Sequence, residues 1–221
     1  MAAMKNPWEE ISLEDYENHM KLDSVMQLQA MNEMMQGQLM EYPVSTVMIL
    51  GVSGGNGLEH ISKKKYHRVY GVDVNETYLQ EAARRYPDLT GCLECIHMDL
   101  TREAERLPQA ELLIANLFIE YVGCTCFQKA VRIVNPEYVS CIIQINTDDA
   151  WVSDSPYLHV FDGLDRIHHE MNEEKLEMAM RETEYLLLNR LEHSLPNKKK
   201  LVRMDFGRFW SEQKETEAVL S

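Results

Sequence analysis

The stretch VMILGVSGGNGLEHI, residues 47–61, decides the fold. It begins with an uninterrupted apolar run at residues 47–50, which is typical of a buried strand. Four glycines then fall within seven residues, between Gly51 and Gly57, and glycine permits backbone dihedrals that a Cβ would forbid. Helix signals follow around residues 57–64. The stretch therefore predicts a strand, a tight turn that a ligand can approach closely, and a helix.

The same alternation continues along the chain. Four further apolar runs predict strands at residues 69–72, 93–98, 112–115 and 139–145. Helical patterns lie between or after them, at residues 75–86, 118–133 and 173–182. Strands that alternate with helices form βαβ units, so most of the sheet should be parallel and covered by helices on both faces.

The end of the chain breaks this alternation. Residues 185–191 and 201–206 are both strand-like, and the short polar segment between them cannot hold a crossover helix. The two strands should therefore form an antiparallel hairpin. The predicted fold is α/β: a doubly wound, Rossmann-like, mostly parallel seven-stranded sheet with a C-terminal antiparallel hairpin and an N-terminal helical cap.

The cap is predicted over residues 1–43, and the ligand-binding domain over residues 44–221. Ser12 and Asp15 have the spacing of a capping box at a helix start. A second helix should begin near Asp23, because apolar residues recur every three or four positions at Leu22, Val25, Leu28, Met31, Met35 and Leu39. The helices could pack on the sheet or act as a lid, since methionine adapts to more than one packing.

Composition and charge exclude several classes of partner. The chain has 22 Lys and Arg against 36 Asp and Glu, a net charge of −14, which should repel nucleic acid and anionic lipid. Basic clusters at residues 63–65 and 198–200 are either solvated loops or local patches. No apolar run is long enough to span a membrane, and the first ten residues lack a secretory pattern. We expect a cytoplasmic protein with five free cysteines.

The cysteines do not predict a metal site. Cys92 and Cys95 form a CxxC pair, but no second pair has the spacing that a structural zinc site requires. We therefore expect no metal.

Polar residues follow the predicted strands at the points where they end. Asp73, Asp99, Asn116 and Asn146 end the second to fifth strands. Asp and Asn are common helix caps and turn formers, but ligands of a doubly wound sheet also bind outside the carboxyl ends of its strands. The loop is neither a dinucleotide GxGxxG, because Ser53 occupies the second glycine position, nor a P-loop, because no lysine follows Gly57.

Residues 47–61 resemble motif I of the class I S-adenosylmethionine (SAM)-dependent methyltransferases. Asp73 resembles the acidic residue of that family that binds the ribose, and Asp99 the residue beside the adenine amino group. The resemblance implies SAM as cofactor, bound by Gly51, Ser53, Gly55, Gly57, Asp73, Val74, Asp99, Leu100 and Asn116. Two positions depart from the family pattern: Ile49 replaces a frequent acid, and Ser53 replaces a glycine.

The resemblance also implies methyl transfer to an acceptor. The expected acceptor is a small molecule; the alternatives are a protein or RNA methyltransferase and a non-catalytic SAM-fold binding module. Candidates for a catalytic base, which the residues alone do not separate, are Glu120, Tyr121, Tyr157 and His159. Tyr16, His19 and Met20 of the cap either wall the pocket or serve ordinary packing.

Overall fold

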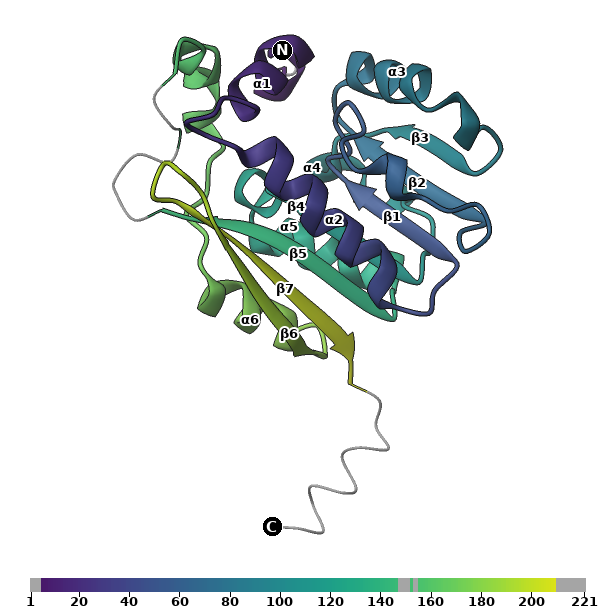
Figure 1. Cartoon of the computed structure of the whole chain (residues 1–221). Helices are drawn as coiled ribbons and strands as arrows, with labels where there is room; N and C mark the ends of the chain where they lie inside the picture. The colour runs from purple at the N-terminus through teal and green to yellow at the C-terminus, as the bar shows by residue number, and fades with distance from the viewer. Residues whose placement is uncertain (1–4, 147–151, 153–154, 210–221) are drawn as a thin grey trace.

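The computed structural model describes residues 5–146, 152 and 155–209. Within them, seven strands form one sheet with the order β3-β2-β1-β4-β5-β7-β6. The strands are β1 Thr46–Leu50, β2 Arg68–Asp73, β3 Leu93–His97, β4 Leu112–Asn116, β5 Tyr138–Ile145, β6 Tyr185–Ser194 and β7 Lys200–Arg208. The first five run parallel, whereas β7 is antiparallel to both β5 and β6. The predicted mostly parallel sheet with its terminal hairpin is confirmed (Figure 1).

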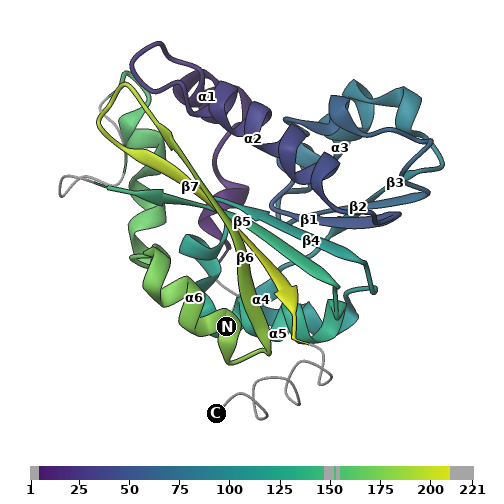
Figure 2. The same ribbon diagram turned by 60° about the horizontal axis from the view of Figure 1, so that its bottom comes forward.

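Helices cover both faces of the sheet. Figure 2 shows α1, α2 and α3 on one side and α4, α5 and α6 on the other. These helices are α1 Leu13–Met20, α2 Gln27–Glu41, α3 Glu76–Arg85, α4 Leu100–Glu103, α5 Ile119–Val134 and α6 Glu173–Arg181. Alternate residues of β1 point to the two layers: Val47 and Ile49 pack with α2 and α3, and Met48 and Leu50 pack with α5. Both faces of β1 are therefore buried, and a ligand can reach this strand only at its carboxyl end.

The helix predicted around residues 57–64 is wrong. The structure has only a 3-10 turn, η2 Leu58–His60, between β1 and β2. Gly57 precedes it at φ +92°, and a Cβ there would lie 2.6 Å from Sδ of Met35 on α2. The backbone oxygen of Leu39 accepts hydrogen bonds from Tyr66 Oη at 2.7 Å and Lys65 Nζ at 2.6 Å. Helix α2, from the N-terminal region, thus covers the sheet where the predicted helix would have packed.

Ser12 caps the first helix as predicted, although with one bond rather than a full capping box, and the second helix begins later than expected. Ser12 Oγ accepts a hydrogen bond from the Asp15 backbone N–H at 3.1 Å and caps α1. Helix α2 starts at Gln27, because Met26 adopts φ +53° and breaks the helical path. On α2, Met35 and Leu39 are buried in the core.

A buried polar chain fixes α2 against the sheet. Gln38 of α2 donates to Ser140 of β5 at 2.8 Å, and Ser140 donates to Asp205 of β7. Arg203 then forms a two-point ion pair with Asp205, Nε to Oδ1 at 2.9 Å and Nη2 to Oδ2 at 2.6 Å. All four side chains are at most 3% exposed, so their polar atoms depend on one another. This series of hydrogen bonds sets the position of Gln38 beside the end of β4.

No helix among the described residues combines the length and the apolar composition needed to cross a bilayer.

Candidate functional site

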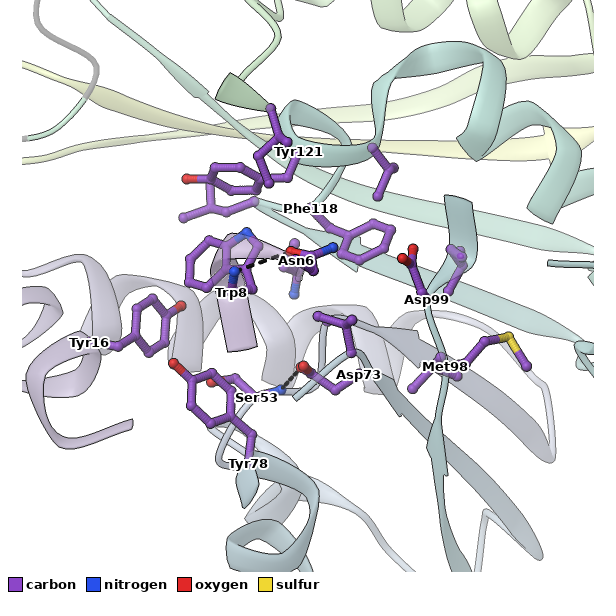
Figure 3. Close-up of a pocket in the computed structure, with 18 residues that line it drawn as sticks. Asn6, Trp8, Tyr16, Ser53, Asp73, Tyr78, Met98, Asp99, Phe118 and Tyr121 are labelled. Atoms are coloured by element: carbon purple, nitrogen blue, oxygen red, sulfur yellow. Dashed lines mark hydrogen bonds between the residues drawn. The ribbon is translucent and has the colours of Figure 1, made fainter. Parts of the chain in front are cut away.

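A cavity lies at the carboxyl ends of β1 to β4, where the predicted ligand-binding residues meet. We call it the first cavity. Seven of the nine residues predicted to bind the cofactor line it: Gly51, Ser53, Asp73, Val74, Asp99, Leu100 and Asn116. They come from four different strand ends, as expected for a parallel sheet (Figure 3).

Gly55 and Gly57 do not line the first cavity. A Cβ on Gly55 would lie 2.8 Å from Leu58 Cδ1 and from the Tyr86 ring, and Gly57 faces Met35. These two glycines make room for protein side chains. Gly51 is different: it lines the cavity at φ +68°, and its Cβ would lie 2.7 Å from the Phe118 ring. The glycine-rich loop therefore meets the cavity through Gly51 and Ser53.

Asp73 holds the loop in place. Its Oδ2 accepts the Ser53 N–H at 2.8 Å, and its Oδ1 accepts the Asn75 N–H at 2.9 Å. Burial raises the pKa of this carboxyl, and the two backbone donors oppose the shift. Each carboxylate oxygen can accept more than one hydrogen bond, so Asp73 can still receive ligand hydroxyls.

Asp99 and Asn116 are each held in place by hydrogen bonds to other protein groups. Asp99 Oδ1 caps α4 by accepting from the Thr101 N–H at 3.0 Å. Asn116 exchanges two amide hydrogen bonds with Gln38, each at 2.9 Å. Both side chains are thus oriented before any ligand arrives, which lowers the entropy lost on binding.

Ser53 carries an unpartnered polar atom into this site. Its Oγ is buried and has no hydrogen-bond partner, although the residue lines the first cavity. Its backbone is also strained, at φ +51°. A buried hydroxyl without a partner costs free energy, so the observation fits a ligand with a polar group beside Gly51.

The remaining wall is apolar and aromatic. Met98, Phe118 and Val122 line it, and Trp8 and Tyr16 of the N-terminal segment close it together with Tyr78 of α3. Figure 3 shows Trp8 lying between Tyr121 and Tyr16. The cavity therefore offers a flat, water-excluding surface next to a few fixed polar groups, as small-molecule sites do.

Three contacts fasten the N-terminal segment over the first cavity. Asn75 Nδ2 donates to the Trp8 carbonyl at 2.9 Å, and Tyr78 Oη donates to the Ile11 carbonyl at 2.9 Å. Arg85 pairs with Glu17 of α1, Nη2 to Oε2 at 2.9 Å. Two of the three contacts start at α3 and the third at its N-cap residue, Asn75, so α1 is tied to the edge of the sheet that carries Asp73.

A second cavity adjoins the first. Trp8, Tyr16, Leu117 and Tyr121 line both. The second cavity is also lined by His19 and Met20 of α1, by Glu120 of α5, and by Phe161 and His168. The expectation that Tyr16, His19 and Met20 wall a pocket agrees with this arrangement. Ligands placed in the two cavities would both contact these four shared residues.

Glu120 is the buried carboxyl of the second cavity. It is 5% exposed, and its Oε1 accepts the Gln144 backbone N–H at 3.1 Å. Its Oε2 has no partner. Burial raises the pKa of the carboxyl to about 7. A carboxyl that titrates near neutral pH in a cleft has the properties of a general base.

The other candidate bases are placed differently. Tyr121 lines both cavities, and burial raises its pKa well above the usual value. Tyr157 and His159 line neither cavity. His159 is 92% exposed at its side chain and lies 3.4 Å from Asp162. The structure therefore brings Glu120 and Tyr121 together and leaves Tyr157 and His159 outside.

The site also contains residues beyond the predicted set. Gln38 bonds to Asn116 beside the first cavity, which its sequence position did not indicate. Phe118 lines the first cavity just after the end of β4, and His168, a histidine that the sequence left as solvated or substrate-facing, lines the second. Among the described residues, no group of three His, Cys, Asp or Glu side chains is placed to hold a metal ion.

Comparison with known proteins identifies the fold. The sequence matches no protein-family model and no curated protein. Among solved structures, magnesium protoporphyrin IX methyltransferase (ChlM) from Synechocystis PCC 6803 with bound SAM has a TM-score of 0.65 at 8% identity, over 95% of this chain and 100% of that one. Geranyl diphosphate C-methyltransferase from Streptomyces coelicolor A3(2), crystallised with S-adenosyl-L-homocysteine (SAH), has a TM-score of 0.61 at 13% identity, over 82% and 77% of the two chains.

The [4+2]-cyclase SpnF is also similar, with a TM-score of 0.62 at 8% identity over 83% of this chain and 82% of that one. The chain thus has the fold of the class I SAM-dependent methyltransferases, as residues 47–61 predicted. Because a cyclase shares this fold, the reaction has to be argued from the site.

Proposed function

We propose that this protein binds SAM in the first cavity and methylates a small molecule held in the second. The observation that carries the proposal is the junction of the two cavities at Trp8, Tyr16, Leu117 and Tyr121. One cavity is lined by the residues of the predicted SAM motif, and the other contains a buried carboxyl of pKa about 7.

The residues of the first cavity match the parts of SAM. Asp73 would accept the ribose hydroxyls, and Asp99 would lie at the adenine amino group. Met98, Leu100 and Phe118 supply the apolar surface that a purine ring requires. Bound SAM would supply a methyl group already activated on a sulfonium. The SAM- and SAH-bound structures of the two neighbouring methyltransferases support this assignment.

The chain's own residues then have three tasks. Trp8 and Tyr16 keep water away from the junction, which protects an activated methyl group from side reactions. The walls of the second cavity orient the acceptor. Glu120 Oε2 accepts the proton that the acceptor loses, because it is unpartnered and its pKa is about 7.

The covering of the site favours a small acceptor over a polymer. Trp8, Tyr16 and α1 lie over both cavities, so a protein or RNA substrate would have to displace them. The net charge of −14 opposes RNA in addition.

A second candidate is a protein that binds SAM without methyl transfer. Two observations favour this candidate: the similarity to a cyclase, and the departures from motif I at Ile49 and Ser53.

Incubation with methyl-labelled SAM and a set of small acceptors tests the proposal. We expect SAH to form in step with a labelled product, and Glu120→Gln to slow the formation by about tenfold or more. The control Glu94→Gln removes an exposed carboxyl on β3 and should leave the rate unchanged. SAM binding without any product would favour the second candidate. No SAM binding would reject both.

A further inference from the structure

We infer that the second cavity binds a protonated amine, with its nitrogen against the carboxylate of Glu120. The inference deepens the proposed function, on which it rests in taking this amine as the methyl acceptor. It is argued from the charges, the unpartnered oxygen and the aromatic walls of the cavity. Glu120 would first remove one proton from the ammonium group, and the lone pair freed on the nitrogen would then take the methyl group of SAM while SAH leaves.

The described lining of the second cavity contains carboxylates but no Lys or Arg. Glu120 is buried there and Glu170 is exposed at its rim. The two histidines of the lining, His19 and His168, have pKa values lowered by burial, so they are mostly neutral at pH 7. Lys199 adds to both shifts, although it does not line the cavity. The lining is therefore neutral or negative.

This distribution of charge discriminates between classes of acceptor. A carboxylate or phosphate would be buried beside Glu120 with no cation in the described lining to balance it, which is costly in a dry site. A protonated amine has the opposite sign and would form an ion pair with Glu120. The cavity thus selects by charge as well as by size.

The unpartnered oxygen points to a hydrogen-bond donor. Glu120 Oε1 is satisfied by the Gln144 backbone N–H, whereas Oε2 has no partner in the protein. In its ionised form a carboxyl only accepts hydrogen bonds, so the partner that ionised Glu120 lacks is a donor. An ammonium group offers three donors and a charge, and charge-assisted hydrogen bonds are the strong ones.

Aromatic rings surround the same space. Trp8 meets Tyr121 edge to face at 4.9 Å between ring centroids and Tyr16 at 5.7 Å. Phe161 packs against the His19 ring at 4.8 Å on the other side of the lining. Ring faces attract cations, and the attraction increases where water is excluded. The walls therefore also favour a cationic ligand.

The charge of the whole chain acts in the same direction. A net charge of −14 raises the rate at which cations reach a cleft and lowers it for anions.

Calorimetry with three probes of similar size but different charge tests the inference. Phenethylamine is cationic, phenethyl alcohol is neutral and hydrocinnamate is anionic. With the full chain at pH 8, we expect phenethylamine to bind about tenfold or more tightly than the alcohol, and hydrocinnamate not to bind. Equal or tighter binding of the alcohol or the acid, or no binding of phenethylamine, would overturn the inference.

The pH dependence identifies the carboxyl that receives the amine. Phenethylamine stays protonated between pH 6 and pH 8, while Glu120, with a pKa of about 7, becomes ionised. The affinity should therefore rise by about tenfold over this range, because only the ionised fraction binds. Glu120→Gln should lower the affinity at pH 8 by about tenfold and abolish its pH dependence. Glu94→Gln is the control for the loss of one negative charge outside the cavity. An unchanged affinity in Glu120→Gln would overturn the assignment, and if this variant does not fold, the pH profile of the unmodified protein decides.

A separate titration with SAH distinguishes the two proposals. If SAH binds and phenethylamine does not, the amine inference fails and the proposed function stands. If phenethylamine binds and SAH does not, the cavity is an amine site and the proposed function fails.

Discussion

Ser53 combines two unfavourable features in the loop that meets the first cavity. Its backbone lies in the left-handed region at φ +51°, which costs a non-glycine residue about 1–2 kcal/mol, and its buried hydroxyl has no partner. Where a glycine is the commoner family residue, such a serine has to be explained. We attribute it to a hydrogen bond that forms only when the cofactor is bound.

Two substitutions at Ser53 separate strain from ligand contact. Ser53→Ala removes the hydroxyl and keeps the strain, whereas Ser53→Gly removes both. Ser53→Gly should therefore be more stable than Ser53→Ala by about 0.5–1 kcal/mol in chemical unfolding, after the entropy that glycine adds to the unfolded chain. Both should bind SAM about threefold to tenfold more weakly than the unmodified protein. Unchanged SAM affinity in both would show that the hydroxyl does not contact the cofactor.

Glu120 should make the stability of the protein depend on pH. Its folded pKa of about 7 lies above the ordinary value of 4.5, so the folded state binds more protons than the unfolded state between these values. Stability must then fall as the pH rises from about 4.5 to 7, by about 3 kcal/mol for a shift of this size. Because the Gln side chain cannot ionise, the stability of Glu120→Gln should not show this decrease with pH.

The measurement compares urea unfolding of Glu120→Gln and the unmodified protein at pH 5 and pH 8. The variant should gain about 2–3 kcal/mol relative to the unmodified protein between the two pH values. Other titrating groups are common to both proteins and cancel. If the difference between the two proteins is the same at both pH values, the Glu120 pKa is close to its ordinary value.

Residue types and strand ends predicted much of the first cavity. Gly51, Ser53, Asp73, Asp99 and Asn116 could be found because the ends of parallel strands meet at one edge of a sheet. The cofactor-binding roles of Gly55 and Gly57 stay predictions; the structure turns these residues toward Tyr86 and Met35, contacts that no motif contains. Glu120 could be named from its place after β4, but its burial, which sets its pKa, depends on tertiary packing.

At the scale of elements, the segment of η1 (Pro7–Glu9) and α1 covers the site. The aromatic residues Trp8 and Tyr16 close both cavities, and a few polar contacts to α3 and its N-cap residue fasten the segment. We expect SAM to enter when these contacts open. The strength of the fastening should therefore control how fast the cofactor exchanges.

Two neighbouring arginines on α3 provide a matched test of this control. Arg84 and Arg85 both pair with Glu81, but only Arg85 also reaches Glu17 of α1. Arg85→Gln should speed SAH release by about twofold to fivefold, as expected for the loss of one partly exposed ion pair. Arg84→Gln should not change it. Stopped-flow displacement of SAH measures both, and equal release rates would show that α1 does not control exchange.

The failed helix prediction at residues 57–64 also belongs to this scale. Local sequence favoured a helix after the loop, yet Gly57 and the packing of Met35 leave only the turn η2. The helix that covers this part of the sheet comes from residues 27–41. Periodicity along the chain cannot show that a distant helix covers the sheet in place of a local one, because tertiary packing decides which helix lies there.

At the scale of the whole molecule, the two helices of the N-terminal region pack in different places. Helix α1 covers the cavities, while α2 packs in the core through Met35 and Leu39 and is fixed by Gln38. The second cavity joins α1, α5 and residues near 161–171, which lie far apart in the sequence. No local pattern predicts such a meeting, and this is why the acceptor site could not be derived in advance.

Two truncations test this division. Removing residues 1–21 deletes η1 and α1 and should leave a folded sheet with weaker SAM binding. Removing residues 1–41 also deletes α2 and should expose the apolar face of β1 and β4, so the protein should aggregate. Circular dichroism measures folding, size-exclusion chromatography measures aggregation, and titration with SAM measures binding. A well-folded, monodisperse protein without residues 1–41 would show that α2 is not part of the core.

The central claim is that SAM occupies the first cavity with its ribose on Asp73, and calorimetric titration of SAM tests it most directly. We predict saturable one-to-one binding to the unmodified protein, and an affinity lower by about tenfold to a hundredfold in Asp73→Ala, because hydrogen bonds to a charged group are lost. Asp88→Ala removes an exposed carboxylate near α3 and should bind SAM as the unmodified protein does. Absence of SAM binding to the unmodified protein, or equal affinity in Asp73→Ala, would contradict the claim.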